Sequence, residues 1–195
     1  MIVAASALPA LLAAILATGC AGGGQAAAAP PPVPADAPRV AVPAEAFSVR
    51  VTRVVDGDTV VAQVGGSGPR VRVRLLGVDT PETVKPGTPV ACYGHEASAF
   101  STALLTGRTL LAAYQDERVD DFGRQLWDLW LPDGRSVQAL LVASGAARAY
   151  PYEPNTAHAT VLADGQALAQ RDRRGLWRAC ALTEAFPQLR SRARP

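Results

Sequence analysis

The sequence predicts an α+β domain that is mainly β, with five strands and three helices. Five strand-length segments alternate apolar and polar residues or are continuously apolar, and they form a group of three followed by a group of two. One helix-length segment separates the two groups, and two more follow the second group. This order is compatible with a small closed barrel to which helices are added. A chain of 195 residues, 49% of them hydrophobic, suits one domain with appendages.

Turn residues mark the ends of the five expected strands. We expect strands over residues 47–55, 59–64, 70–75, 108–114 and 125–131. An Asp-Gly-Asp turn at 56–58 joins the first two as a hairpin, and a Gly- and Pro-rich turn leads into the third. In the third strand, arginines alternate with aliphatic residues, which predicts one wet face and one buried face.

Helical spacing of apolar residues predicts the three helices. The first covers residues 93–106, the second follows Ser136 and ends at Gly145, and the third ends near Arg171. Ser136 is the expected N-cap of the second helix. For the third helix, the expected N-cap is Asn155 or Thr156.

The N-terminus has the features of an export signal. Residues 1–20 contain an apolar segment that is short for a membrane span and ends in Ala-Thr-Gly-Cys. A small residue before Cys20 resembles a bacterial lipoprotein signal, so Cys20 is a lipidation candidate that would attach the chain to a membrane. An ordinary signal peptide and an uncleaved anchor are the alternatives, and all three place the domain outside the cytoplasm. Residues 21–46, rich in Ala, Gly and Pro, are expected to form a disordered tether.

Charge is distributed unevenly along the chain. The net charge is +2, but the residues from Arg171 onward hold seven arginines against two acids, so that the rest of the chain sums to −3. This distribution excludes a broadly basic nucleic-acid coat, and any phosphate binding must be local. We expect residues 181–195 to form a basic, solvated tail.

Cys92 and Cys180 remain as an even pair once Cys20 is set aside. In an oxidising compartment they would form a disulfide, and closing a loop of about 88 residues would contribute about 4–5 kcal/mol. Two free buried thiols are the alternative. The export signal favours the disulfide.

The chemistry is concentrated in residues 72–82, which read Arg-Val-Arg-Leu-Leu-Gly-Val-Asp-Thr-Pro-Glu. A strand that presents Arg74 is followed by a turn that carries Asp79 and Glu82. A hard cation binds oxygen ligands, a phosphodiester binds guanidinium groups, and attacking water needs a positioned carboxylate. This stretch holds all three kinds of group.

Together, four segments resemble the thermonuclease (staphylococcal nuclease-like) family. They are Asp-Gly-Asp-Thr at 56–59, Arg-Leu-Leu-x-Val-Asp-Thr-Pro-Glu at 74–82, Tyr-Gly-x-Glu-Ala at 93–97 and Gly-Arg at 123–124. The resemblance covers residues 47–177 and implies a nuclease domain over 47–180 with a five-stranded OB-fold barrel. The face of such a barrel commonly binds nucleic acids and sugars.

The resemblance implies a calcium site next to the catalytic groups. Asp58 and Asp79 are the expected ligands, with the Thr80 backbone carbonyl and waters completing the shell around Ca²⁺. Asp56 is expected to lie behind these ligands and to orient water or the turn itself. For Asp58 alone, an ordinary hairpin-turn aspartate would be the better interpretation, but Asp58 and Asp79 together favour metal binding.

Three further residues are expected to act on the phosphodiester. Glu82 is the candidate general base, and Arg74 and Arg124 would stabilise the charge of the five-coordinate transition state. Helix capping for Glu82 and a plain strand-surface position for Arg74 are the alternatives.

Two tyrosines match the nucleotide pocket of the family. Tyr150 and Tyr152 would stack on a base and bond a phosphate, and the alternative is that they cover the barrel edge. The chain departs from the family at Asp121-Phe122, where Lys-Tyr is common; this implies weaker binding of a terminal phosphate.

The sequence therefore predicts an exported, monomeric, Ca²⁺-dependent phosphodiesterase that acts on DNA, with RNA as a further substrate. No protein partner is evident from the sequence. The alternative is a non-catalytic OB-fold lipoprotein that binds nucleic acid or an envelope partner. The joint presence of the two aspartates, the glutamate and the two arginines argues against that alternative.

Overall fold

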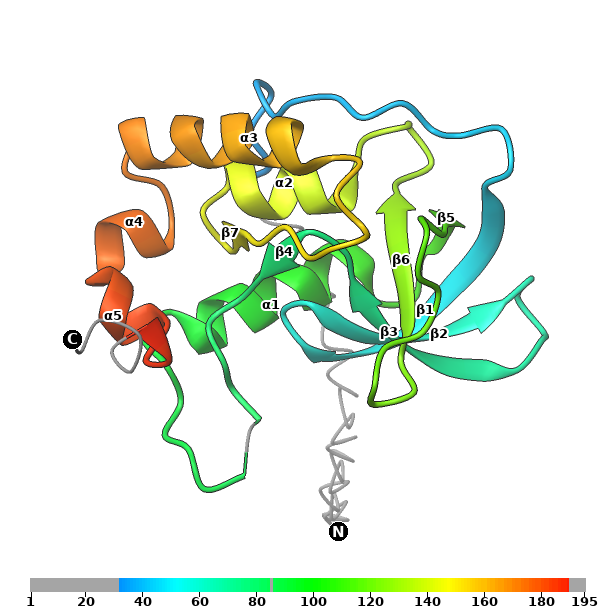
Figure 1. The fold of residues 1–195 in the computed structure, drawn as a ribbon, viewed down its shortest axis with the longest axis horizontal. Helices are drawn as coiled ribbons and strands as arrows, with labels where there is room; N and C mark the ends of the chain where they lie inside the picture. The colour runs from blue at the N-terminus through cyan, green and yellow to red at the C-terminus, as the bar shows by residue number, and fades with distance from the viewer. Residues whose placement is uncertain (1–31, 85, 190–195) are drawn as a thin grey trace, which may run out of the picture.

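A closed five-stranded barrel forms the body of the protein (Figure 1). The computed structural model describes residues 32–84 and 86–189. The barrel strands are β1 (Phe47–Asp56), β2 (Thr59–Val64), β3 (Arg70–Leu75), β5 (Thr109–Ala113) and β6 (Gln125–Trp130). They pair in the order β1-β2-β3-β6-β5, antiparallel except for β3 and β6, which run parallel. The predicted α+β fold class with an OB-type barrel is confirmed.

Alternation along the strands separates the inside of the barrel from its outside. The inward residues of the first three strands are completely buried (Val49, Val51, Val60, Ala62 and Val73). The outward positions of β3 carry arginines, as the period-two pattern predicts. On β1, Arg50 and Arg53 also point outward, because a register shift between Val51 and Arg53 interrupts the alternation. Trp127 closes one side of the barrel interior, where its ring lies edge-on to Phe47 and Tyr114.

Among residues 32–84 and 86–189, five helices lie beside the barrel rather than the three predicted. The predicted helices are α1 (Gly94–Leu105), α2 (Val137–Ala143) and α3 (Ala159–Arg171), and two short ones follow as α4 (Leu176–Ala179) and α5 (Leu182–Ala185). Helix α1 packs against β1, and α2 lies between α3 and the barrel (Figure 1). Ser136 caps α2 as predicted, since its side chain accepts from the Ala139 N–H.

The predicted cap of the third helix is wrong. Helix α3 begins after His158, and no side chain caps its first turn. The Asn155 side chain instead accepts from the Glu117 N–H and donates to the Glu117 carbonyl, so that it fastens two loops together. This buried amide thus pairs with both backbone polar groups of a residue 38 positions away, rather than with the first turn of α3.

The predicted disordered tether does not describe residues 32–46. This segment runs along the helices and the barrel end before it enters β1 (Figure 1). Val40 is buried against Trp130 and its carbonyl accepts from the Trp130 indole N–H at 3.0 Å, while Asp36 pairs with Arg174 at 2.8 Å. Specific side chains thus hold a segment whose composition suggested a tether. Cys20, the export signal and residues 21–31 lie outside the described residues.

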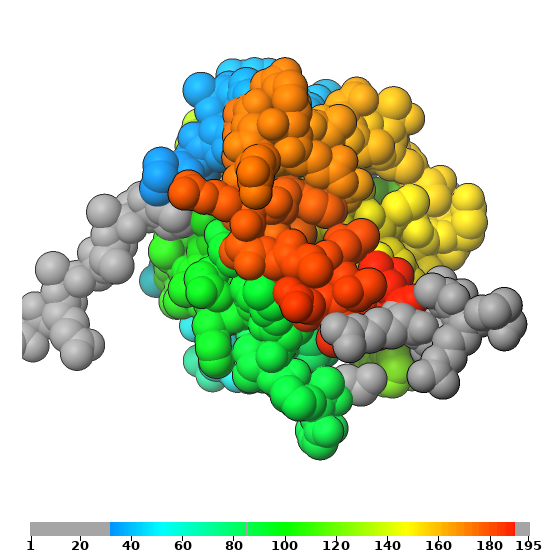
Figure 2. Space-filling model, turned by 90° about the vertical axis from the view of Figure 1, so that its left-hand side faces the viewer, coloured from blue at the N-terminus to red at the C-terminus, as the bar shows by residue number. Residues whose placement is uncertain are grey.

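The C-terminal residues 181–189 also belong to the domain, contrary to the predicted solvated tail. Phe186 is buried with Leu176 and Ala185 in a small cluster against Tyr93. A disulfide joins Cys92 to Cys180, with 6.0 Å between their Cα atoms. Figure 2 shows the C-terminal segment in red against the green segment around the start of α1. Residues 190–195 lie outside the described part of the chain. Within the described part, no helix is long and apolar enough to cross a membrane.

Candidate active site

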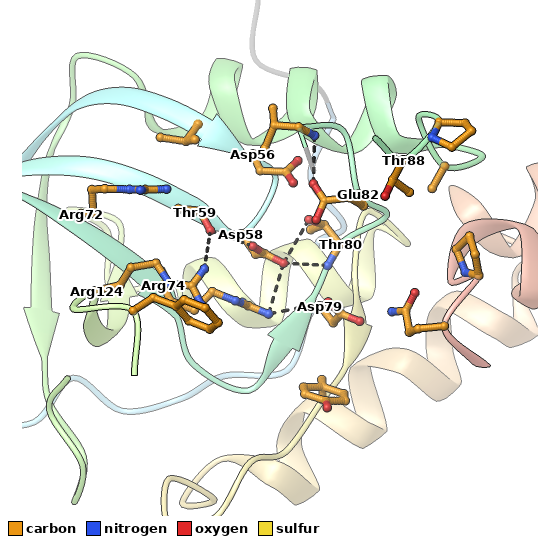
Figure 3. Close-up of a pocket in the computed structure, with 18 residues that line it drawn as sticks. Asp56, Asp58, Thr59, Arg72, Arg74, Asp79, Thr80, Glu82, Thr88 and Arg124 are labelled. Atoms are coloured by element: carbon orange, nitrogen blue, oxygen red, sulfur yellow. Dashed lines mark hydrogen bonds and ion pairs between the residues drawn. The ribbon is translucent and has the colours of Figure 1, made fainter. Parts of the chain in front are cut away.

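A cleft of about 720 Å³ opens beside the ends of β1 and β3 (Figure 3). Its walls come from the 56–59 turn, from β3, from β4 (Val78–Asp79) and the loop that follows it, and from the residues after α5. It gathers most of the residues predicted from the sequence (Asp56, Asp58, Arg74, Asp79, Thr80, Glu82, Arg124 and Tyr150). Tyr152 is the exception and lies in a neighbouring hollow.

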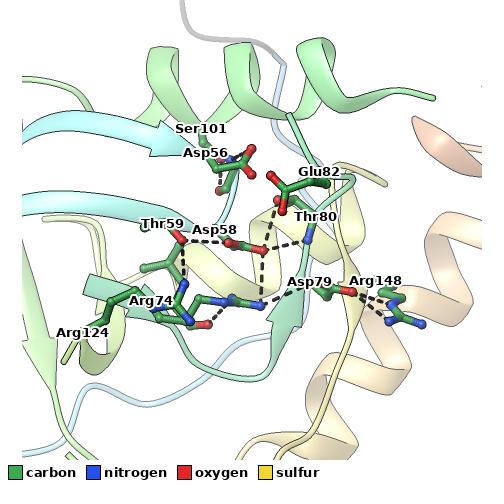
Figure 4. A network of polar contacts seen from close by, with 12 residues as sticks. Asp56, Asp58, Thr59, Arg74, Asp79, Thr80, Glu82, Ser101, Arg124 and Arg148 are labelled. Carbon is green, nitrogen blue, oxygen red and sulfur yellow. Dashed lines mark hydrogen bonds and ion pairs between the residues drawn. The ribbon is translucent and has the colours of Figure 1, made fainter. Parts of the chain in front are cut away.

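Asp58 is the more buried of the two predicted metal-binding carboxylates. Its Oδ2 accepts from the Thr80 N–H at 3.0 Å and from the Thr80 hydroxyl at 3.1 Å, and its Oδ1 accepts from the Thr59 hydroxyl (Figure 4). These bonds join the hairpin turn to the turn after β4. They place the two acidic turns against each other, although Asp58 and Thr80 are 22 positions apart in the sequence.

Arg74 lies between the two carboxylates. Its Nη2 is 3.3 Å from Asp58 Oδ2 and 3.6 Å from Asp79 Oδ1, and its Nη1 donates to the Leu75 carbonyl (Figure 4). A cationic group therefore already bridges Asp58 and Asp79 in the structure. The same guanidinium faces the cleft, where a phosphate oxygen could be its third partner.

Arg148 is a residue of the site that the sequence analysis missed. It lies on β7 (Arg148–Ala149), which pairs with β4 and sets Arg148 opposite Asp79. Its Nε and Nη2 both donate to Asp79 Oδ2, at 2.9 and 2.8 Å. The only signal in the sequence is an arginine two residues before Tyr150, and strands of two residues show no periodicity from which their pairing could be predicted.

Arg124 approaches the cleft from the opposite side to Asp79 (Figure 3). Its Nη1 donates to the Thr59 hydroxyl at 3.4 Å, and its Nε pairs with Asp120 at 2.7 Å. The guanidinium lies 5.4 Å from the ring centre of Phe122, which is 83% exposed. Asp120 thus orients this arginine, and the exposed Phe122 ring lies beside its guanidinium.

Glu82 and Asp56 lie together on the other wall of the cleft. Glu82 Oε1 accepts from the Thr83 and Val84 N–H groups at 3.0 and 2.9 Å, which orients the carboxylate. Asp56 accepts from the Gly57 N–H and from the Thr83 hydroxyl. Burial raises the pKa of Asp56 to about 6, and the neighbouring Glu82 and Asp58 carboxyl groups act in the same direction.

The two tyrosines lie in a hollow next to the cleft. Tyr150 is 37% exposed and Tyr152 53% exposed, and both border a hollow of about 230 Å³ next to the cleft. Its floor is the apolar end of β3, and its rim carries Glu117, Asp120 and Asp121. The Arg148 guanidinium lies 5.0 Å from the Tyr150 ring centre. Arg74 and Arg124 border the same hollow, so it offers aromatic and apolar surface to a base beside the two arginines of the cleft.

The donor set fits a hard divalent cation. In the described ranges 32–84 and 86–189, no three Asp, Glu, His or Cys side chains converge in a ready-made metal cluster. Burial, and the nearby Asp58 charge, raise the pKa of Asp79 even though two arginines oppose the shift. Asp58 and Asp79 line one water-accessible cleft, and their carboxylate oxygens are the kind of ligand that an ion such as Ca²⁺ prefers; Arg74, which contacts both, would share them with the ion.

Comparison with known proteins places these residues in a family context. The sequence pattern of the family described as Staphylococcal nuclease homologue matches residues 72–179. The chain is 42% identical to the thermonuclease of Staphylococcus intermedius over 130 residues, which are 67% of this chain and 76% of that protein. It is 40% identical to the thermonuclease of Staphylococcus hyicus over 135 residues, which are 69% and 78% of the two chains.

A third relative is endonuclease YncB of Bacillus subtilis (strain 168). It is 39% identical over 132 residues, which are 67% of this chain and 61% of that protein. The matched regions include the cleft residues from β3 through α4. The chain therefore belongs to the staphylococcal nuclease homologue family.

Proposed function

We propose that this chain is a Ca²⁺-dependent nuclease that hydrolyses phosphodiester bonds of DNA, and of RNA as a second substrate, outside the cytoplasm. As a member of this family the chain is a nuclease, and the family is metal-dependent in general. One observation carries the more specific proposal. Arg74 lies within 3.3 Å of Asp58 and 3.6 Å of Asp79, so cation-binding and phosphate-binding groups share one cleft.

Asp58, Asp79 and the Thr80 carbonyl would hold the metal ion. Bound Ca²⁺ would neutralise charge on the phosphate and favour attack by water. Arg74 and Arg124 reach the cleft from different strands and would donate to phosphate oxygens, stabilising the added negative charge of the transition state. Glu82, oriented by two backbone N–H groups, would accept the proton of the attacking water. The water oxygen would bond to phosphorus as the bond to the 5′ oxygen breaks; the leaving oxygen would take a proton from solvent water, and Glu82 would return its proton to solvent.

Location outside the cytoplasm is part of the same proposal. It rests on the apolar N-terminal segment with Cys20 at its end and on the cysteine pair that forms a disulfide. Lipid attachment at Cys20 would hold the nuclease at a membrane. Metabolic labelling with a radioactive fatty acid, with Cys20→Ser as the control, tests this part separately from catalysis.

The experiment on catalysis uses the purified full chain and single-stranded DNA, with Ca²⁺ and with chelator. We expect cleavage only with Ca²⁺ and a fall in kcat of about 10²–10⁴-fold in Glu82→Gln, because the base for water is lost. Arg74→Ala should lower kcat by about 10²-fold or more. Glu96→Gln, an exposed glutamate on α1, removes the same charge outside the cleft and should cleave like the wild type.

A folded protein that binds DNA but does not cleave it would support the alternative, a non-catalytic nucleic-acid-binding barrel. Cleavage that Ca²⁺ does not affect would refute the metal assignment. Equal loss in Glu82→Gln and Glu96→Gln would refute the assignment of the base.

A further inference from the structure

The outer face of β1, β2 and β3 carries two columns of arginines that lead away from the cleft. On β3 they are Arg70 and Arg72, followed by Arg74 at the site, and on β1 they are Arg50 and Arg53. All except Arg74 are exposed. Along a strand, alternate residues point to the same face, so the β3 arginines lie about 7 Å apart.

The strand register sets the two columns opposite each other. Gln63 of β2 pairs with Arg50 on one side and with Arg70 on the other. Val61 likewise pairs with Arg53 and with Arg72. The columns therefore stand two strand spacings apart, about 10 Å, on either side of a neutral floor formed by β2.

Within the described residues, no acidic side chain forms an ion pair with the exposed arginines of this face. Asp and Glu are absent from residues 46–55 and from residues 59–78. A positive surface of this kind is unusual in a chain whose residues before 171 sum to a negative charge.

The floor between the columns ends at the catalytic groups. Thr59, the first residue of β2, pairs with Arg74, donates to Asp58 and accepts from Arg124. Arg72 already lines the cleft, where Figure 3 labels it on the same side as Arg74 and Arg124. A polyanion that passes through the cleft can thus continue along β2 between the two columns of arginines.

We propose that this face is a track for the phosphodiester backbone of a single nucleic-acid strand, which extends the substrate site beyond the cleft. This inference rests on the proposed nuclease function and adds the form of its substrate, an extended strand longer than the cleft. The distance of about 10 Å between the two columns leaves room for one nucleic-acid strand, with its phosphates facing the arginines. Solvated surface arginines with no ligand are the competing interpretation.

The test compares two triple variants of the full chain. Arg50→Gln/Arg53→Gln/Arg70→Gln removes the part of the track outside the cleft. Arg39→Gln/Arg173→Gln/Arg178→Gln removes the same charge from exposed positions elsewhere and serves as the control. Binding of a fluorescent single-stranded DNA is measured in chelator, so that the DNA is not cut, over a range of salt concentrations.

We expect the track variant to bind the DNA at least about tenfold more weakly than the control at 0.1 M salt. Its slope of log K against log salt concentration should be shallower by about 2, which is about 0.7 for each lost phosphate contact. With Ca²⁺, its kcat/KM for long DNA should fall relative to that for the nitrophenyl phosphodiester of a single nucleoside, which occupies only the cleft. Equal slopes and equal affinities in the two variants would overturn the track. If the wild type binds DNA through the track but cuts neither substrate, the nuclease proposal fails while the track stands.

Discussion

Arg148 holds Asp79 through two hydrogen bonds to one oxygen, from Nε at 2.9 Å and from Nη2 at 2.8 Å. The same guanidinium lies 4.3 Å from the ring centre of Phe186 and 5.0 Å from that of Tyr150. Phe186 belongs to the C-terminal cluster, which the Cys92–Cys180 disulfide joins to the start of α1. The orientation of a proposed metal ligand thus depends on a part of the chain that the sequence suggested was a tail.

Replacing Arg148 should weaken calcium binding through loss of this orientation. Arg148→Lys keeps the charge but cannot reproduce the two donors of the planar group, and Arg148→Gln removes the charge as well. We expect both variants to lower Ca²⁺ affinity and kcat by about 10–100-fold, the usual cost of losing a group that orients a metal ligand. Calorimetric titration with Ca²⁺ measures the affinity, and initial rates on DNA measure kcat.

The direction of the change in Ca²⁺ affinity shows whether Arg148 acts by orienting Asp79 or only through its positive charge. If Arg148 acted only through its charge, removing it in Arg148→Gln would tighten Ca²⁺ binding, and Arg148→Lys would resemble the wild type. That pattern would contradict the positioning role. Arg178→Gln, an exposed arginine on α4, is the matched control and should leave both quantities unchanged.

The disulfide should account for a large part of the stability of the domain. It connects residues 88 positions apart, and loop-closure entropy for a loop of that length gives about 4–5 kcal/mol. We expect Cys92→Ala/Cys180→Ala to lower the free energy of unfolding by about 2–5 kcal/mol in urea titrations at neutral pH. Reduction of the wild type with dithiothreitol should give the same loss, and an unchanged urea midpoint after either treatment would argue against the bridge.

The barrel and the cleft could be predicted because their signals are local and repeated. In β3, arginine alternates with valine and leucine over six residues, which fixes both the strand and its faces. The residues of the Asp-Gly-Asp and Asp-Thr-Pro-Glu segments are typical of turns, so the sequence predicts the local backbone at both places. Their meeting at Asp58 and Thr80 was predictable only through resemblance to a family, because no periodicity reports contacts between distant turns.

The parts that could not be predicted depend on single long-range contacts. The pairing of two strands of two residues each places Arg148 beside Asp79, and a helix of four residues places Phe186 beside Arg148. Elements of this length carry too few residues for a pattern. The 32–46 segment misled for a different reason: its Ala- and Pro-rich composition is that of a linker, while a few apolar side chains and the Asp36–Arg174 pair attach it to the domain.

Detaching residues 32–46 should therefore destabilise the domain. Val40 is 6% exposed and packs on Trp130, so Val40→Asp would bury an unpaired charge or release the segment. We expect the free energy of unfolding to fall by about 2–3 kcal/mol, limited by what the segment contributes when bound. The neighbouring Ala41→Asp adds the same charge at an exposed position and should change it by less than about 0.5 kcal/mol. Equal stability of the two variants would restore the disordered tether.

His158 gives the fold a dependence on pH that is separate from catalysis. Its Nε2 lies 3.4 Å from Oδ2 of the buried Asp128, which also accepts from Gln115 and Gln138. Hydrogen bonding to Asp128 raises the pKa of His158 above its usual value. Because the folded-state pKa is raised, the stabilisation is fully present below the unfolded pKa of about 6.5 and is lost as pH rises through the folded pKa.

His158→Gln keeps a hydrogen-bonding side chain and removes the titration. We expect the wild type to exceed this variant in unfolding free energy by about 1–2 kcal/mol at pH 5.5, and the difference to shrink steadily as pH approaches 9. Urea titrations at a series of pH values, without Ca²⁺, measure it. In an Asp128→Asn background the His158→Gln difference should lose its dependence on pH, because the raised pKa comes from that carboxylate. If the difference in unfolding free energy between wild type and His158→Gln stays constant over this pH range, Asp128 does not stabilise the protonated form of His158 in the folded protein.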